Sequence, residues 1–116
     1  MRLRLGLEFG LYPLWRLTDE NITMGNILAK DLGLSIELSK KIDRLNSLFH
    51  SLFIDNAIEF AYIGGQHLEV EKEITSLQAE IADEIRAELK DGDELVEVWH
   101  FYTAKEMEAE KAISEM

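Results

Sequence analysis

The sequence predicts an α+β fold in which two or three helices pack on a small sheet of two to three strands. Apolar residues alternate with period two near the N-terminus, and residues 94–102 are rich in β-branched and aromatic types, which indicates strands. Between these segments apolar residues recur every three to four positions, as in amphipathic helices. We expect the order strand, hairpin, helix, helix, strand, helix. The length of 116 residues fits a single domain.

The N-terminal segment contains a predicted strand and a predicted hairpin. Alternation over residues 2–9 places four apolar side chains on one face: Leu3, Leu5, Leu7 and Phe9. Gly10 and Pro13 then end the strand. Residues 14–17 and 22–24 are short extended pieces on either side of a polar turn, and we interpret them as a small hairpin.

A first helix is predicted from the N-cap residue Ser35 to about Asp55 and Asn56. Its apolar stripe has spacings of four, three, four and three: Leu38, Ile42, Leu45, Phe49 and Leu52. Residues 57–63 are apolar and fit either a further helical turn or a short strand. Gly64 and Gly65 end this stretch in both cases.

Residues 68–90 form the clearest helical pattern. The predicted buried stripe consists of Ile74, Leu77, Ile81, Ile85 and Leu89. Alanines at 79, 82 and 87 would allow a neighbouring element to approach closely. Gly92 suits the left-handed conformation that commonly follows a helix end.

Both faces of residues 94–102 are largely apolar, which predicts a strand that is central in its sheet or covered on both sides. Thr103 and Glu106 have the spacing of a capping box and predict the start of a third helix. That helix has few apolar residues. We therefore assign residues 1–103 to the domain and residues 104–116 to a C-terminal helical tail.

Negative charge is concentrated in the second half of the chain. Residues 1–50 contain seven basic and six acidic residues, whereas residues 51–116 contain five basic and seventeen acidic ones. Because phosphate contacts require clustered lysine and arginine, we predict no nucleic-acid partner. An acidic surface instead attracts a basic protein, although acidity can also serve solubility alone. The predicted binding carboxylates lie within one helix: Glu80, Asp83, Glu84 and Glu88.

Aromatic residues supply a second set of candidate binding residues. Tyr12 and Trp15 flank Pro13, and both residue types are common binding anchors. The alternative is that Trp15 closes the side of the core. We place three further aromatic residues in the core: Trp99, Phe101 and Tyr102.

Short signatures of catalysis are missing from the sequence. There is no cysteine, no nucleophile elbow and no phosphate-binding glycine loop, so we predict neither an enzyme nor a cofactor nor a metal site. We interpret His50, His67 and His100 as structural or surface residues. The alternative is a small enzyme or metal protein using His67 with nearby carboxylates, since Glu71 lies four positions away. We find no apolar run of signal-peptide or membrane-span length, so we expect a cytoplasmic protein that does not bind membranes.

Several stretches resemble a group of small uncharacterised bacterial proteins. They are residues 13–15, 32–38, 45–46 and 52–53, with the acidic helix at 77–89 leading into residues 96–98. Some such proteins are similar to immunity proteins, which neutralise a toxin. The resemblance implies a binding role and assigns no functional residue. We therefore predict an acidic protein-binding module, with an immunity-type inhibitor of a basic toxin or enzyme as its particular form. A homodimer of unknown role is the remaining alternative.

Overall fold

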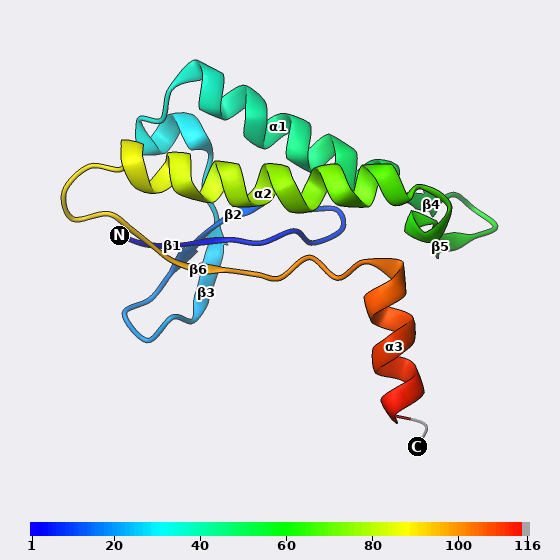
Figure 1. Cartoon of the computed structure of the whole chain (residues 1–116). Coiled ribbons are helices and arrows are strands. Elements are labelled where there is room, and N and C mark those ends of the chain that lie inside the picture. The colour runs from blue at the N-terminus through cyan, green and yellow to red at the C-terminus, as the bar shows by residue number, and fades with distance from the viewer. Residues whose placement is uncertain (115–116) are drawn as a thin grey trace.

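Two helices, α1 (Ile36–Ser51) and α2 (Leu68–Glu88), lie side by side over one face of a four-stranded sheet (Figure 1). The structure is a computed structural model that describes residues 1–114. The sheet contains β1 (Arg2–Leu5), β2 (Leu14–Leu17), β3 (Thr23–Asn26) and β6 (Glu94–Val98). The hairpin of β4 (Phe53–Asp55) and β5 (Phe60–Tyr62) follows α1, and α3 (Ala104–Ser114) comes last. The predicted α+β class is confirmed.

The sheet has the order β3-β2-β1-β6, so it is wider than the two or three strands expected. β1 pairs antiparallel with β2 and parallel with β6. Of the two alternatives predicted for residues 94–102, the central position in the sheet is wrong, because β6 lies at an edge and ends at Val98. The apolar residues after Val98 serve other contacts: Trp99 packs over Gly6, and Phe101 joins the core.

The core lies between the two layers. Its most buried members are at most 2% exposed and come from β1, β2, α1 and α2: Leu3, Leu5, Leu14, Leu38, Ile42, Leu45, Ile74, Ile81 and Ile85. The predicted stripes are therefore largely confirmed. Leu77 and Leu89 are only half-buried, and Ala82 alone of the three predicted alanines is buried. Burial of these side chains drives the helices onto the sheet.

The two ends of α1 differ in how well they were predicted. At its start, the Ser35 hydroxyl accepts a hydrogen bond from the Leu38 amide at 3.2 Å, as expected of an N-cap. Its predicted end near Asp55 and Asn56 is wrong, because the helix stops at Ser51. The following residues pair as β4 and β5 instead, which resolves the ambiguity of residues 57–63. The side-chain oxygen of Asn56 stabilises their turn by accepting bonds from the Ile58 and Glu59 amides.

The face of the sheet opposite the helices carries its own small cluster. Arg4 is 6% exposed and lies over the Trp99 ring, 4.3 Å from its centroid. Its Nε donates to Glu97 at 3.0 Å and its Nη1 donates to Thr23 at 2.7 Å. Gly6 makes room for Trp99, because a Cβ at Gly6 would lie 2.5 Å from that ring. A buried arginine therefore keeps its charge satisfied by a carboxylate and an aromatic face.

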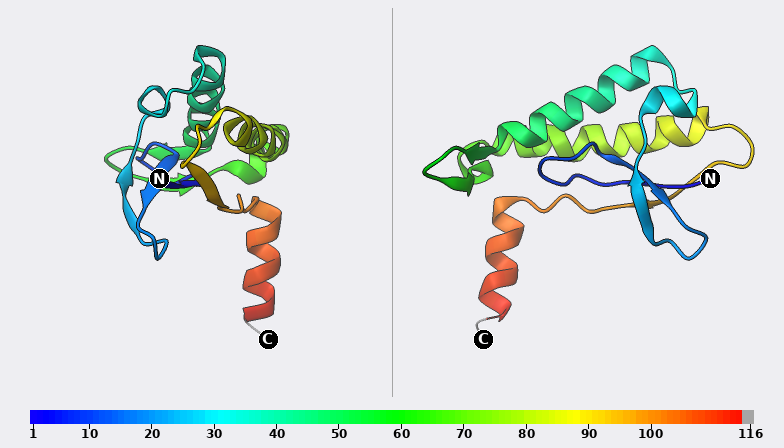
Figure 2. Two further views of the ribbon diagram at one scale, coloured as in Figure 1. Left: turned by 90° about the vertical axis from the view of Figure 1, so that its left-hand side faces the viewer. Right: turned by 180° about the vertical axis from the view of Figure 1, so that it is seen from behind.

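α3 stands away from the two layers (Figure 2). The Cα radius of gyration is 15.4 Å, larger than the roughly 13.4 Å typical of a compact domain of this length. Most of the helix is exposed, and its contacts with the body are made by its first turns. None of the helices in the described part of the chain is long and apolar enough to cross a membrane.

Candidate functional site

A hollow of about 250 Å³, lined mainly by aromatic side chains, lies between the end of α1, the β4–β5 hairpin and the first turns of α3. We call it the aromatic hollow. Its lining comes from four separate stretches of the sequence: Leu7; Phe49 and Phe53; Tyr62; and Trp99, His100, Phe101, Tyr102 and Met107. The hollow therefore forms only when the helices, the hairpin and the chain after β6 come together.

Ring contacts hold the walls of the hollow in place. Phe53 and Tyr62 are direct partners across the hairpin, with ring centroids 5.2 Å apart. Phe49, at the end of the α1 stripe, meets Phe53 at 5.1 Å and Phe101 at 6.2 Å, both edge to face. These are favoured geometries for aromatic pairs, so the walls are rigid and preorganised.

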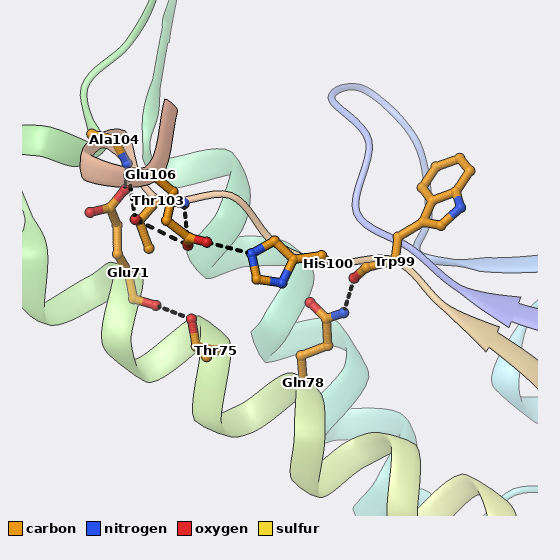
Figure 3. Close-up of polar contacts among 8 residues, drawn as sticks. All are labelled: Glu71, Thr75, Gln78, Trp99, His100, Thr103, Ala104 and Glu106. Carbon is orange, nitrogen blue, oxygen red and sulfur yellow. Dashed lines mark hydrogen bonds and ion pairs between the residues drawn. The ribbon is translucent and has the colours of Figure 1, made fainter. Parts of the chain in front are cut away.

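Glu71 is 2% exposed and joins three elements at the back of this site. Its Oε2 accepts the Tyr62 hydroxyl at 2.6 Å, which links α2 to the hairpin. The same oxygen accepts the Ala104 backbone N–H at 2.7 Å, which links α2 to the start of α3 (Figure 3). Gly64 permits this, because a Cβ there would lie 2.2 Å from the Tyr62 oxygen. Burial, followed by the bond to Glu71, raises the pKa of Tyr62, so its hydroxyl remains a donor.

His100 and Glu106 form the second polar contact at the hollow. His100 Nε2 lies 2.7 Å from Glu106 Oε2, while Glu106 Oε1 accepts from the Thr103 N–H at 3.2 Å (Figure 3). The Glu106 amide in turn donates to the Thr103 hydroxyl at 3.2 Å, which confirms the predicted capping box. The bonds from His100 and Thr103 lower the pKa of Glu106, so this carboxyl is ionised at neutral pH.

Gln78 positions the chain that separates the aromatic hollow from a neighbouring one. Its Nε2 donates to the carbonyl of Trp99 (Figure 3). Its Oε1 is buried without a hydrogen-bond partner among the described residues. The neighbouring hollow, of about 260 Å³, lies between α2 and residues 98–101. Trp99, His100 and Phe101 line both hollows, so the Gln78 contact sets a shared wall.

Exposed apolar side chains gather on the elements that build the aromatic hollow. Five of them, which we call the hairpin-end surface, are Ile58, Phe60, Leu68, Tyr102 and Met107, with exposed fractions of 97, 60, 56, 51 and 39%. The placement of Tyr102 in the core is therefore wrong. The chain turns into α3 directly after Tyr102, which leaves that ring at the edge of the hollow rather than between the layers.

Three of the four predicted binding carboxylates make contacts within the chain. Lys41 Nζ on α1 lies 2.9 Å from Glu80 and 2.7 Å from Glu84, and these two bonds, that to Glu84 first, raise the pKa of Lys41. Glu88 accepts from the backbone N–H and the hydroxyl of Ser35 at 2.6 and 2.8 Å. Asp83 is exposed. The row therefore links α2 to α1 rather than forming one open acidic face.

The two predicted aromatic anchors, Tyr12 and Trp15, differ in how far their side chains are exposed to solvent. Trp15 is 6% exposed, and its indole N–H donates to the Gly6 carbonyl at 2.9 Å. Tyr12 is half-buried, and its hydroxyl accepts from the Ala29 amide at 3.4 Å. Burial is the main cause of a raised Tyr12 pKa. Trp15 thus closes the second face of the sheet, where it meets Trp99 at 6.1 Å.

The histidines occupy unrelated places. His50 accepts a hydrogen bond from the Gly10 amide at its Nε2, and its Nδ1 lies 2.8 Å from the Asn46 carbonyl, which matches a neutral imidazole. His67 is exposed and precedes α2, whereas the neighbouring Glu71 is turned towards Tyr62 and Ala104. Within residues 1–114, no three histidine, aspartate or glutamate side chains are grouped to hold a metal ion.

The sequence interpretation missed Gln78, and it considered Glu71 only as a possible partner of His67. Both lie on the buried face of α2, because positions 71, 74, 78, 81 and 85 follow the spacing of one helical stripe. Two polar residues in phase with three isoleucines were a usable signal. Such a residue must find a hydrogen-bond partner when it is buried, so it marks a place where another element docks.

The site is suited to binding, because it combines an aromatic hollow, exposed apolar side chains and nearby carboxylates. No protein-family model matches the chain, and no curated protein does either.

Proposed function

We propose that the chain is a protein-binding module whose basic partner docks on the hairpin-end surface. The observation that carries this proposal is the exposure of Tyr102 at an aromatic hollow and of Ile58 and Phe60 on the hairpin that helps to build it. Single exposed apolar residues are common, but several large ones around a hollow are typical of interaction sites. Rigid aromatic side chains of this kind supply most of the energy at protein interfaces.

Charge supports a basic partner. Segments 53–73 and 99–113, which build this end of the molecule, contain eight acidic and three basic residues. The β4–β5 hairpin itself carries Asp55 and Glu59 and no basic residue. An apolar centre with an acidic rim favours a complementary basic surface and speeds its association.

An immunity-type inhibitor of a basic toxin or enzyme is the particular form that we propose. Such an inhibitor needs a preorganised anchor site, because ordering costs reduce affinity, and it needs charge complementary to its target. The rigid ring contacts around Phe53 and the acidic rim meet both requirements. The resemblance of the sequence to small bacterial proteins with immunity-like members points the same way.

A pull-down from the source cell extract at low and high salt tests the proposal. The full chain carrying Ile58→Asp and Phe60→Asp is compared with the wild type and with a matched control, Ile36→Asp. Ile36 is 73% exposed but lies at the start of α1. We expect a basic protein to bind the wild type and the control, more weakly at high salt, and to be lost from the hairpin variant. If both the hairpin variant and the Ile36→Asp control still bound the partner, or if both failed to bind it, the proposed site would be wrong.

One observation favours a homodimer as a second candidate. β3 lies at an edge of the sheet, and Ile22 and Met24 on or beside it are 63 and 59% exposed. An exposed edge strand is a template for pairing with another chain. Light scattering at micromolar concentration separates the candidates: a monomer removes this one and leaves the first intact.

A further inference from the structure

We propose that the aromatic hollow receives an arginine side chain of the basic partner, held between aromatic faces and the carboxylate of Glu106. This inference rests on the proposed function and specifies the chemistry of its anchor. The hollow measures about 250 Å³, below the range of roughly 300–1,000 Å³ typical of small-molecule sites. Its size suits one side chain rather than a cofactor.

The lining selects a flat cation with an apolar stem. Tyr62 and Tyr102 present aromatic rings, whose faces attract cations electrostatically. The Tyr62 hydroxyl stays protonated because it donates to Glu71, so that ring adds no charge of its own. A guanidinium is planar, weakly hydrated and able to stack on aromatic rings, while its three-carbon stem covers apolar surface.

Carboxylates accompany this lining. Glu106 is ionised and contacts the lining residue His100. Glu71 contacts Tyr62 directly, and within the described residues it forms no ion pair with a lysine, arginine or histidine. A partner that placed only an aliphatic side chain here would bring no cation to the Glu106 carboxylate. Charge complementarity therefore favours a cation.

The chain already contains the same arrangement once. Arg4 lies over the Trp99 ring at 4.3 Å while its Nε bonds Glu97 at 3.0 Å. Arg4 is only 6% exposed, so this fold accommodates an arginine between a ring and a carboxylate even when the arginine is buried. The partner's arginine would meet the same combination at the hollow, with Tyr62 or Tyr102 as the ring and Glu106 as the carboxylate.

Titration of the full isotope-labelled chain with three short peptides tests this inference by NMR. The probes are acetyl-Gly-Arg-Gly-amide, its citrulline analogue, which keeps the shape without the charge, and its norleucine analogue, which keeps only the apolar stem. We expect the arginine peptide to shift the signals of residues 99–102 and the Trp99 indole. Its Kd should be at least about five-fold lower than that of either analogue. No shift in this segment, or equal binding of the norleucine peptide, would overturn the inference.

Two exposed variants separate the contributions without unfolding the chain. Tyr102→Leu keeps an apolar side chain but removes an aromatic face, and it should weaken arginine binding by about two- to five-fold while leaving norleucine binding unchanged. Glu106→Gln keeps the capping box and removes the charge, and it should weaken binding where the control Glu108→Gln does not. Equal effects of the two glutamine variants would contradict a role for Glu106. The pull-down with Ile58 and Phe60 variants does not depend on peptide binding, so each proposal can fail separately.

Discussion

Along the contact between α1 and α2, carboxylates expected to face a partner are bonded within the chain. At the hairpin end, apolar side chains expected to be buried or left unassigned are exposed. Glu80 and Glu84 hold Lys41, whereas Ile58 and Phe60 face solvent. The difference teaches that the position of charge in a sequence does not reveal whether that charge is available. A neighbouring helix of the same chain can form ion pairs with an acidic stripe, just as a binding partner would.

The largest effect is expected where the hairpin end is tied to the body. Glu71→Ala removes the acceptor for the Tyr62 hydroxyl and the Ala104 amide. We expect the free energy of unfolding to fall by about 2–3 kcal/mol in urea denaturation, because two bonds are lost and their donors stay buried without an acceptor. The control Glu69→Ala changes an exposed glutamate in the same first turn and should alter the free energy of unfolding by less than about 0.5 kcal/mol. If the free energy of unfolding fell equally in both variants, the contacts of Glu71 would not contribute to stability.

A smaller effect is expected at the α1–α2 contact. Glu88→Lys removes the acceptor for the Ser35 amide and hydroxyl and should lower the free energy of unfolding by about 1 kcal/mol. Asp83→Lys makes the same charge change five residues earlier and should stay within about 0.5 kcal/mol. Chemical denaturation measures both. If both variants were equally stable and both lost the partner, the acidic row would be a binding surface after all.

The start of α3 should depend on pH through Glu106. Its pKa is lowered in the folded chain, first by His100 and then by Thr103. The contact therefore adds stability above the ordinary Glu pKa of 4.5, and this stability is lost as the pH falls through the lowered folded pKa. The Met107 amide is bonded to the Thr103 carbonyl, and its protection against hydrogen exchange, corrected for the intrinsic pH dependence of the exchange rate, should fall on acidification. Glu106→Gln should flatten this acid limb, and an unchanged profile would exclude Glu106 as its source.

The smallest change in stability is expected at the tip of the hairpin. Ile58 is 97% exposed, so Ile58→Asp should alter the free energy of unfolding by no more than about 0.5 kcal/mol. Thermal unfolding of this variant next to Ile36→Asp measures it. A clear loss of stability would mean that Ile58 packs in the folded chain, and the hairpin end would then resemble the α1–α2 contact.

Local patterns predicted much of the fold and little of the site. Alternation placed Leu3 and Leu5 correctly, and the Ser35 cap and the Thr103–Glu106 box depend on residues three apart. The hairpin after α1 was missed, because its strands have only three residues each and its pairing depends on ring contacts with α1. The hollow was missed for the same reason, since Tyr62, Tyr102 and Met107 meet only in three dimensions.

By itself, the sequence determined the helices, the strands, the buried stripes and the overall acidity, because each depends on residue type and on spacing within a few turns. Only the tertiary structure decided which charges and which rings are free. Glu88 is occupied because α2 ends beside the start of α1, and Tyr102 is exposed because the chain turns outward at Thr103. A charge or a ring is available to a partner only if no internal contact uses it, and such contacts can join residues 53 positions apart, as between Ser35 and Glu88.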